Sequence, residues 1–147
     1  MTQGPFICHV DALEWQEVRA QQHGDRRASV WNRFVDVGPD RTVIYTRYDA
    51  GMILARHSHH SDEVILILDG ELSVGGEMCR AGSVIVLDAG DSFGPLITGE
   101  RGAVLFEVFN GRPDRAGQDQ SEFEALLRER NVVELDDCPP FRLPPPR

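Results

Sequence analysis

The sequence predicts an all-β domain with a short helix near its C-terminal end. Three observations support this fold class. Short runs rich in Val, Ile, Phe and Tyr fill the middle of the chain, and Gly, Pro and Asp interrupt them at intervals typical of a sandwich or barrel. An amphipathic helical pattern follows the last of these runs. A chain of 147 residues is long enough for a single domain with one hydrophobic core.

The strands are expected where these apolar runs occur. The predicted β segments are residues 28–38, 42–49, 63–70, 71–76, 82–88 and 102–109. The stretches "LDGEL" and "VGGEM" are typical of tight hairpin turns. The run "EVILILD" is apolar at both odd and even positions, which predicts a strand covered on both faces.

The chain divides into three expected regions. Residues 1–27 are predicted to form an N-terminal strand or arm, residues 28–110 the barrel, and residues 111–147 a linker, a helix and a Pro-rich tail that pack on the barrel. Because proline fixes φ and lacks the donor N–H, the tail "CPPFRLPPPR" is expected to be either an extended strap or disordered.

A short helix is predicted over residues 121–130. Ser121 opens this segment and Glu124 follows three residues later, which is the capping-box pattern. Phe123, Leu126 and Leu127 would form one apolar stripe, so the helix is expected to dock on the outside of the barrel.

Composition excludes several classes of function. The formal net charge of -9 and the pI near 4.9 argue against binding to nucleic acid or to an anionic membrane, both of which select basic surfaces. No signal-peptide pattern and no membrane-spanning apolar run is present. Three widely spaced cysteines without a CxxC pair favour a reduced, cytoplasmic protein.

The stretch "GMILARHSHHSDEVILILDG", residues 51–70, carries the strongest chemical signal. His57 and His59 are two positions apart, so on an extended segment both side chains project to the same side. Glu63 begins the apolar run that follows. Two imidazoles and one carboxylate could bind a transition metal and leave positions open for substrate, water or dioxygen. The alternative is a polar, solvated loop whose histidines bind nothing.

The same stretch fits the pattern G-x5-H-x-H-x3-E-x6-G from Gly51 to Gly70 without a gap. It resembles the first signature motif of the cupin superfamily. This resemblance covers roughly residues 28–110 and implies a double-stranded β-helix, a jelly-roll barrel, with a divalent metal at its mouth. The lead-in "RTVIYTRYDAG" is similar to small cupins related to the sensor half of zinc anti-sigma factors and to acetylacetone-type dioxygenases.

A second cupin motif should follow, and here the sequence departs from the family pattern. Gly82 and Gly90 stand at glycine positions, but Asp88 replaces a proline, Phe93 a histidine and Ile97 an asparagine. The family histidine at the position of Phe93 is the fourth metal ligand, and phenylalanine cannot coordinate a metal.

Three outcomes of this change remain open. The site keeps His57, His59 and Glu63 as ligands, or it has lost its metal, or another residue supplies the fourth ligand. The substitutes considered are His60, Asp91, Glu100 and Glu107. For each of these a solvated side chain is the more common outcome.

A substrate pocket is predicted around the same site. Phe93 could stack on a substrate or fill space in the core. By strand parity, Tyr45 and Arg47 share the side of His57 and could meet an aromatic or anionic substrate. Glu107 lies in the last predicted strand and is a further candidate pocket residue.

The resemblance implies a metal-dependent enzyme acting on a small molecule, with dioxygenase chemistry first and Fe2+ the favoured metal. Zn2+, Ni2+ and Mn2+ also suit this donor set. One alternative is an isomerase or lyase acting on a small carbonyl or sugar-like substrate. Another is a non-catalytic metal- or ligand-sensing cupin, or a degenerate structural one. A homodimer is expected because open sheet edges need cover.

Overall fold

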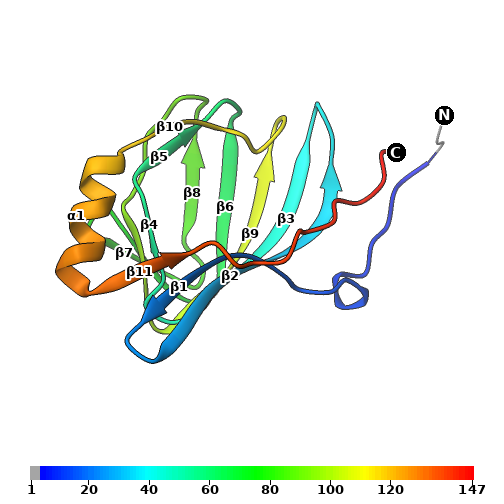
Figure 1. Ribbon diagram of the computed structural model, residues 1–147. Coiled ribbons are helices and arrows are strands. Elements are labelled where there is room, and N and C mark those ends of the chain that lie inside the picture. The colour runs from blue at the N-terminus through cyan, green and yellow to red at the C-terminus, as the bar shows by residue number, and fades with distance from the viewer. Residues whose placement is uncertain (1–3) are drawn as a thin grey trace.

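The computed structural model describes residues 4–147 and has the predicted architecture, an antiparallel jelly-roll barrel with a helix on its outside (Figure 1). After the 3-10 turn η1 (Val10–Ala12), the elements are β1 (Gln16–His23), β2 (Arg26–Val37), β3 (Thr42–Tyr48), β4 (Ile53–Leu54), β5 (His57–His59), β6 (Glu63–Val74), β7 (Glu77–Arg80), β8 (Val84–Leu87), β9 (Leu96–Phe109), β10 (Arg115–Gln118), α1 (Gln120–Arg130) and β11 (Val132–Leu135).

Two sheets build the barrel. The large sheet has the strand order β11-β1-β2-β3-β9-β6-β7, with β4 paired to β9 and β8 paired to β6. The small sheet pairs β10 with β5, so the segment after the barrel lies beside the histidine strand. The main core is formed largely by strands of the large sheet and includes Ile65, Ile67, Leu72 and Leu105, each at most 1% exposed.

Strand β6 is continuous where the sequence predicted a hairpin at "LDGEL". Gly70 adopts φ +74° inside this strand, next to a bulge, and pairs with Ala103 of β9. A Cβ at Gly70 would lie 2.1 Å from the carbonyl oxygen of Gly102, so the glycine permits a close backbone approach rather than a chain reversal. The second predicted hairpin is confirmed, because Gly75 and Gly76, both with positive φ, join β6 to β7.

The prediction that β6 is covered on both faces is wrong for its outer face. Val64 and Leu68 are 45% and 43% exposed, while Val84 and Val86 of the neighbouring β8 are 58% and 70% exposed. Val64 pairs with Val86 in this antiparallel ladder, so these side chains form one apolar surface, here called the β6–β8 face.

Helix α1 lies outside the barrel, as predicted. Phe123 is buried against Ile53, Ala55 and Val132 in a core of its own. The N-cap differs from the prediction: Asp119, not Ser121, accepts a hydrogen bond from the backbone N–H of Glu122. Asn131 ends the helix in the left-handed conformation.

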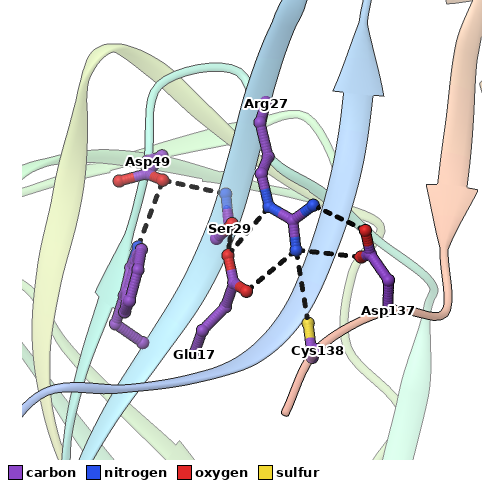
Figure 2. Close-up of polar contacts among 7 residues, drawn as sticks. Glu17, Arg27, Ser29, Asp49, Asp137 and Cys138 are labelled. Carbon is purple, nitrogen blue, oxygen red and sulfur yellow. Dashed lines mark hydrogen bonds and ion pairs between the residues drawn. The ribbon is translucent and has the colours of Figure 1, made fainter.

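The Pro-rich tail is an extended strap, one of its two predicted forms. It crosses the barrel after β11 (Figure 1). Figure 2 shows the guanidinium of Arg27 joining Glu17 of β1 to Asp137 at the start of this strap, with N–O distances of 2.8 and 2.9 Å. Further along, Phe141 stacks on Phe34 with ring centroids 5.4 Å apart, which holds the strap over the open end of the barrel.

Candidate functional site

A cavity of about 580 Å³ occupies the open end of the barrel. Its walls are mainly apolar side chains of the barrel strands, and Phe141 and Leu143 of the strap line it as well. The polar side chains that line it include His57, His59 and Glu107. A concave, mostly apolar pocket with a few convergent polar groups is typical of a small-molecule site.

Strand β5 presents both histidines to this cavity, as the two-residue spacing predicted. Nδ1 of His57 lies 2.7 Å from the carbonyl oxygen of Ala55, and Nδ1 of His59 lies 3.1 Å from that of Pro113. A carbonyl only accepts, so each Nδ1 carries the proton and each Nε2 keeps its lone pair. Burial lowers the pKa of His57 to about 4 and lowers that of His59, which keeps both imidazoles neutral near neutral pH.

Glu63 lies buried behind this pair and is 1% exposed. Its Oε1 is 3.8 Å from Nε2 of His59. Both carboxylate oxygens are buried, and no described residue donates a hydrogen bond to them, apart from the Glu107 carboxyl when one of the two carboxyls holds a proton. An ionised carboxylate without a partner is costly in such a place, so Glu63 requires either a bound proton or a cation.

Glu107 is the nearest acidic neighbour of Glu63. Its Oε2 accepts a hydrogen bond from the hydroxyl of Thr46. Burial, reinforced by the Glu107 carboxyl, raises the pKa of Glu63 far above its usual range, and burial raises the pKa of Glu107 as well. The two carboxyls therefore retain protons that an exposed glutamate would lose.

Phe93 stands beside His57 and is 7% exposed. The backbones of the two residues exchange hydrogen bonds of 2.9 and 3.0 Å, which pairs them across the cavity mouth. The phenyl ring lies 4.8 Å from the His57 ring and 6.4 Å from the His59 ring, measured between centroids. The residue that replaces the family histidine thus forms an apolar wall against the imidazole pair.

The chemistry of these residues fits a divalent transition metal, although no preformed cluster is present. Within residues 4–147, no three His, Cys, Asp or Glu side chains are arranged closely enough to hold a metal ion. The donor types nevertheless match: two neutral imidazoles with free Nε2 atoms and a carboxylate with orphaned oxygens. Carbonyl acceptors behind each Nδ1 are the usual support for metal-binding histidines.

Two of the predicted pocket residues lie elsewhere. Tyr45 and Arg47 alternate along β3 with Thr46, whose side chain lines the cavity, so they point to the outer face. There Tyr45 packs on Phe106, and the Arg47 guanidinium lies over Trp15 and Trp31. Parity counted from His57 failed because a turn and β4 separate β3 from β5.

The proposed substitute ligands differ in whether they are exposed or line the cavity. His60, Asp91 and Glu100 are exposed, and Oδ2 of Asp91 accepts a hydrogen bond from the backbone of Asp88 within the turn. Glu107 lines the cavity. It is therefore the substitute candidate that the fold brings to the histidines.

Sequence reasoning missed the cationic residues that line the cavity, among them Arg19 of β1 and Arg115 of β10. β1 falls in the region predicted only as an N-terminal strand or arm, and β10 falls in the predicted linker, because "QEVRAQQH" and "RAGQ" lack a run of β-branched or aromatic residues. No signal in the sequence alone placed these arginines beside His57.

Comparison with known proteins identifies the family. The model of the ChrR cupin-like domain matches residues 3–111, so the chain belongs to this cupin family. No curated protein matches the chain. Several solved structures share its fold, and the sequence identities are low enough that the likeness concerns the fold alone.

KdgF from Halomonas sp. is 21% identical at a TM-score of 0.59, covering 76% of this chain and 97% of its own. A candidate acetylacetone dioxygenase from Methylibium petroleiphilum is 12% identical at a TM-score of 0.61, and the match covers 85% of this chain and 96% of that protein. The polyketide cyclase RemF from Streptomyces resistomycificus is 15% identical at a TM-score of 0.63, and the match covers 86% of this chain and 96% of that protein. These proteins include a candidate dioxygenase and a cyclase, so the fold does not select a reaction. In the described part of the chain, the helix is too short and polar to cross a membrane.

Proposed function

We propose that this chain is a metal-dependent cupin enzyme for a small organic molecule, with His57, His59 and Glu63 as the metal ligands. The observation that carries the proposal is the buried carboxyl of Glu63, whose Oε1 lies 3.8 Å from Nε2 of His59 and which has no hydrogen-bond donor among the described residues other than the carboxyl of Glu107. A cation at this place would satisfy the carboxylate and use the lone pairs of both imidazoles.

The favoured activity is that of a dioxygenase with Fe2+; Zn2+, Ni2+ and Mn2+ suit the same donors. When bound, such a metal supplies a Lewis acid with open positions for substrate and, in the case of Fe2+, for O2. The similarity of the lead-in "RTVIYTRYDAG" to acetylacetone-type dioxygenases supports this choice.

The protein side of the chemistry follows from the cavity. The carbonyls of Ala55 and Pro113 fix the tautomer and orientation of the two imidazoles. The Phe93 ring excludes water on one side of His57. Glu107 reaches the cavity and, with its raised pKa, can hold a proton near a bound substrate.

An isomerase or lyase on a small carbonyl or sugar-like substrate is the second candidate, and the specific observation that favours it is the Glu107 carboxyl. A carboxyl with a raised pKa that lines a substrate cavity suits proton transfer, which these reactions need and a simple oxygenation does not. Consumption of O2 with substrate present distinguishes the two classes. If no metal binds, the chain is a non-catalytic or degenerate cupin.

The test is metal analysis of protein purified without a histidine tag, reloaded with Fe2+ or Mn2+. Wild type should hold one divalent ion per chain and Glu63→Gln little, while Glu77→Gln, a change on exposed β7, should match wild type. Glu63→Gln should remain folded, because a neutral amide replaces a carboxyl that already retains its proton in the metal-free state. Equal metal content in Glu63→Gln and wild type would refute the proposal.

A further inference from the structure

Arg19 reaches the cavity because β1 carries a bulge. The β1–β2 register shifts between Glu17 and Arg19, so two consecutive residues, Val18 and Arg19, both line the cavity. Arg19 pairs with Val30 of β2, whose side chain belongs to the main core. In a regular strand only one of the two side chains, Val18 or Arg19, would face the inside of the barrel. The bulge therefore places the Arg19 guanidinium on the inner face together with Val18.

The Arg19 guanidinium has no anionic partner among residues 4–147. Its Nη1 is buried and lacks a hydrogen-bond partner in the described part of the chain, and no carboxylate of residues 4–147 forms an ion pair with it. A buried cation is costly unless it is paired. An anionic ligand bound in the cavity would supply the missing partner.

Arg115 supplies a second cation to the same cavity. It stands opposite His59 in the β10–β5 register, and its Nη1 donates to the side-chain oxygen of Gln118, a neutral group. Arg19, Arg115 and the imidazoles of His57 and His59 line the same cavity, so the two guanidiniums share it with the imidazole pair.

Other charges at the cavity do not offset this pair. Arg112 is neutralised by Asp114 at 3.5 Å and is exposed. Glu107 also lines the cavity, but it accepts a hydrogen bond from Thr46 and forms no ion pair with either arginine among the described residues. In a protein of net charge -9, this arginine pair thus lacks an anionic partner within the described residues, and its charge opposes the sign of the whole chain.

We propose that Arg19 and Arg115 form a carboxylate-binding subsite, and that the substrate is a small organic carboxylate with an apolar body. Its role as a substrate subsite rests on the proposed function, whereas binding of the anion does not. Planar guanidinium forks match a carboxylate. The apolar walls formed by Val30, Leu54 and Leu105 would receive the rest of the molecule, and the His57–His59 pair would lie beside it.

The experiment compares benzoate with benzamide, its neutral analogue, and with phenyl phosphate, by calorimetry on chelator-treated and on metal-loaded full-length protein. Benzoate should bind and benzamide should bind at least ~10-fold more weakly, because a hydrogen bond to a charged group contributes about 1.5–3 kcal/mol. Arg19→Met and Arg115→Met should each weaken benzoate ~10-fold or more and leave benzamide unchanged.

The matched control is Arg33→Met. Arg33 is also largely covered, with a side chain 19% exposed, but it lies over Trp15 on the outer face of the barrel. This variant should bind benzoate like wild type. Ligand-free Arg19→Met should unfold at a temperature no lower than wild type, since the change removes an unpaired cation.

Several results would overturn the subsite. These are no detectable binding of benzoate at millimolar concentration, equal binding of benzamide, an equal loss in Arg33→Met, or binding of phenyl phosphate much tighter than benzoate. Benzoate binding to protein that takes up no metal would leave the subsite standing and remove the proposed enzyme. Stoichiometric metal without benzoate binding would remove the subsite and leave the proposed enzyme standing.

Discussion

Phe93 packs on His57 with ring centroids 4.8 Å apart, at the position where the second cupin motif carries a histidine. The two residues are joined by a pair of backbone hydrogen bonds, so the side chain at position 93 is directed to the same side as His57. A phenyl ring therefore occupies the place from which the fourth family ligand would reach a metal.

Phe93→His should raise metal affinity ~10-fold or more, because one added ligand worth about 1.4 kcal/mol is a factor of ten. The new imidazole would stand beside His57, with which position 93 is paired. If Glu107 already serves as fourth ligand, Phe93→His should change little and Glu107→Gln should lose affinity strongly. Titration of both variants with Mn2+ separates these cases; no change in either would contradict both.

His57→Ala and His59→Ala should each abolish stoichiometric metal, because two remaining side chains rarely hold a labile ion. His60→Ala is the matched control: its side chain is exposed and it follows His59 directly, so the metal content should stay at the wild-type level. Elemental analysis of the three untagged variants provides the measurement. Full metal content in His59→Ala would rule out the ligand set.

The chain should form a homodimer through the β6–β8 face. Val84 and Val86 are 58% and 70% exposed there, beside Val64 and Leu68, and exposed apolar surface of this kind marks an interface. Light scattering should give twice the chain mass of 16.4 kDa. Joint Val84→Lys and Val86→Lys substitution should give monomer, while Val133→Lys, equally exposed on β11, should not. A wild-type monomer at micromolar concentration would contradict the prediction.

Acid should release the strap from the barrel. The Arg147 guanidinium, and then that of Arg41, lower the pKa of Asp36 below its usual value, against the effect of burial. A depressed folded-state pKa adds stability above the unfolded-state value near 4, and this stability disappears as pH falls through the lower, folded-state pKa. Thermal unfolding of Arg147→Gln should show a modest loss at pH 7 that vanishes near pH 2. A loss that is independent of pH would exclude this linkage.

Gly70→Ala should destabilise the barrel by about 3 kcal/mol or more, because it combines a positive φ with overpacking against the Gly102 carbonyl. Gly24→Ala is the control, since its φ of +63° is similar but a Cβ there has nothing within 4 Å. It should cost only about 1–2 kcal/mol. Urea unfolding compares the two variants, and equal costs would show that the close approach is unimportant.

The sequence by itself determined the all-β class, the helix on the outside and the shared direction of His57 and His59. Each of these follows from a local period: apolar runs of strand length, a 3.6-residue stripe, and the two-residue repeat of an extended chain. The pairing of Glu63 with this histidine pair also follows, because the strand that it opens begins only four residues later.

Only the tertiary structure decided which charges surround that site. Arg19 lines the cavity because of a bulge in a strand without apolar alternation. Arg115 lines it because β10 pairs with β5, which lies more than fifty residues earlier in the chain. Tyr45 and Arg47 lie on the outer face of β3, because a turn between β3 and β5 breaks the alternation counted from His57. Pairing partners, bulges and turns are set by long-range packing, which no local pattern of residues encodes.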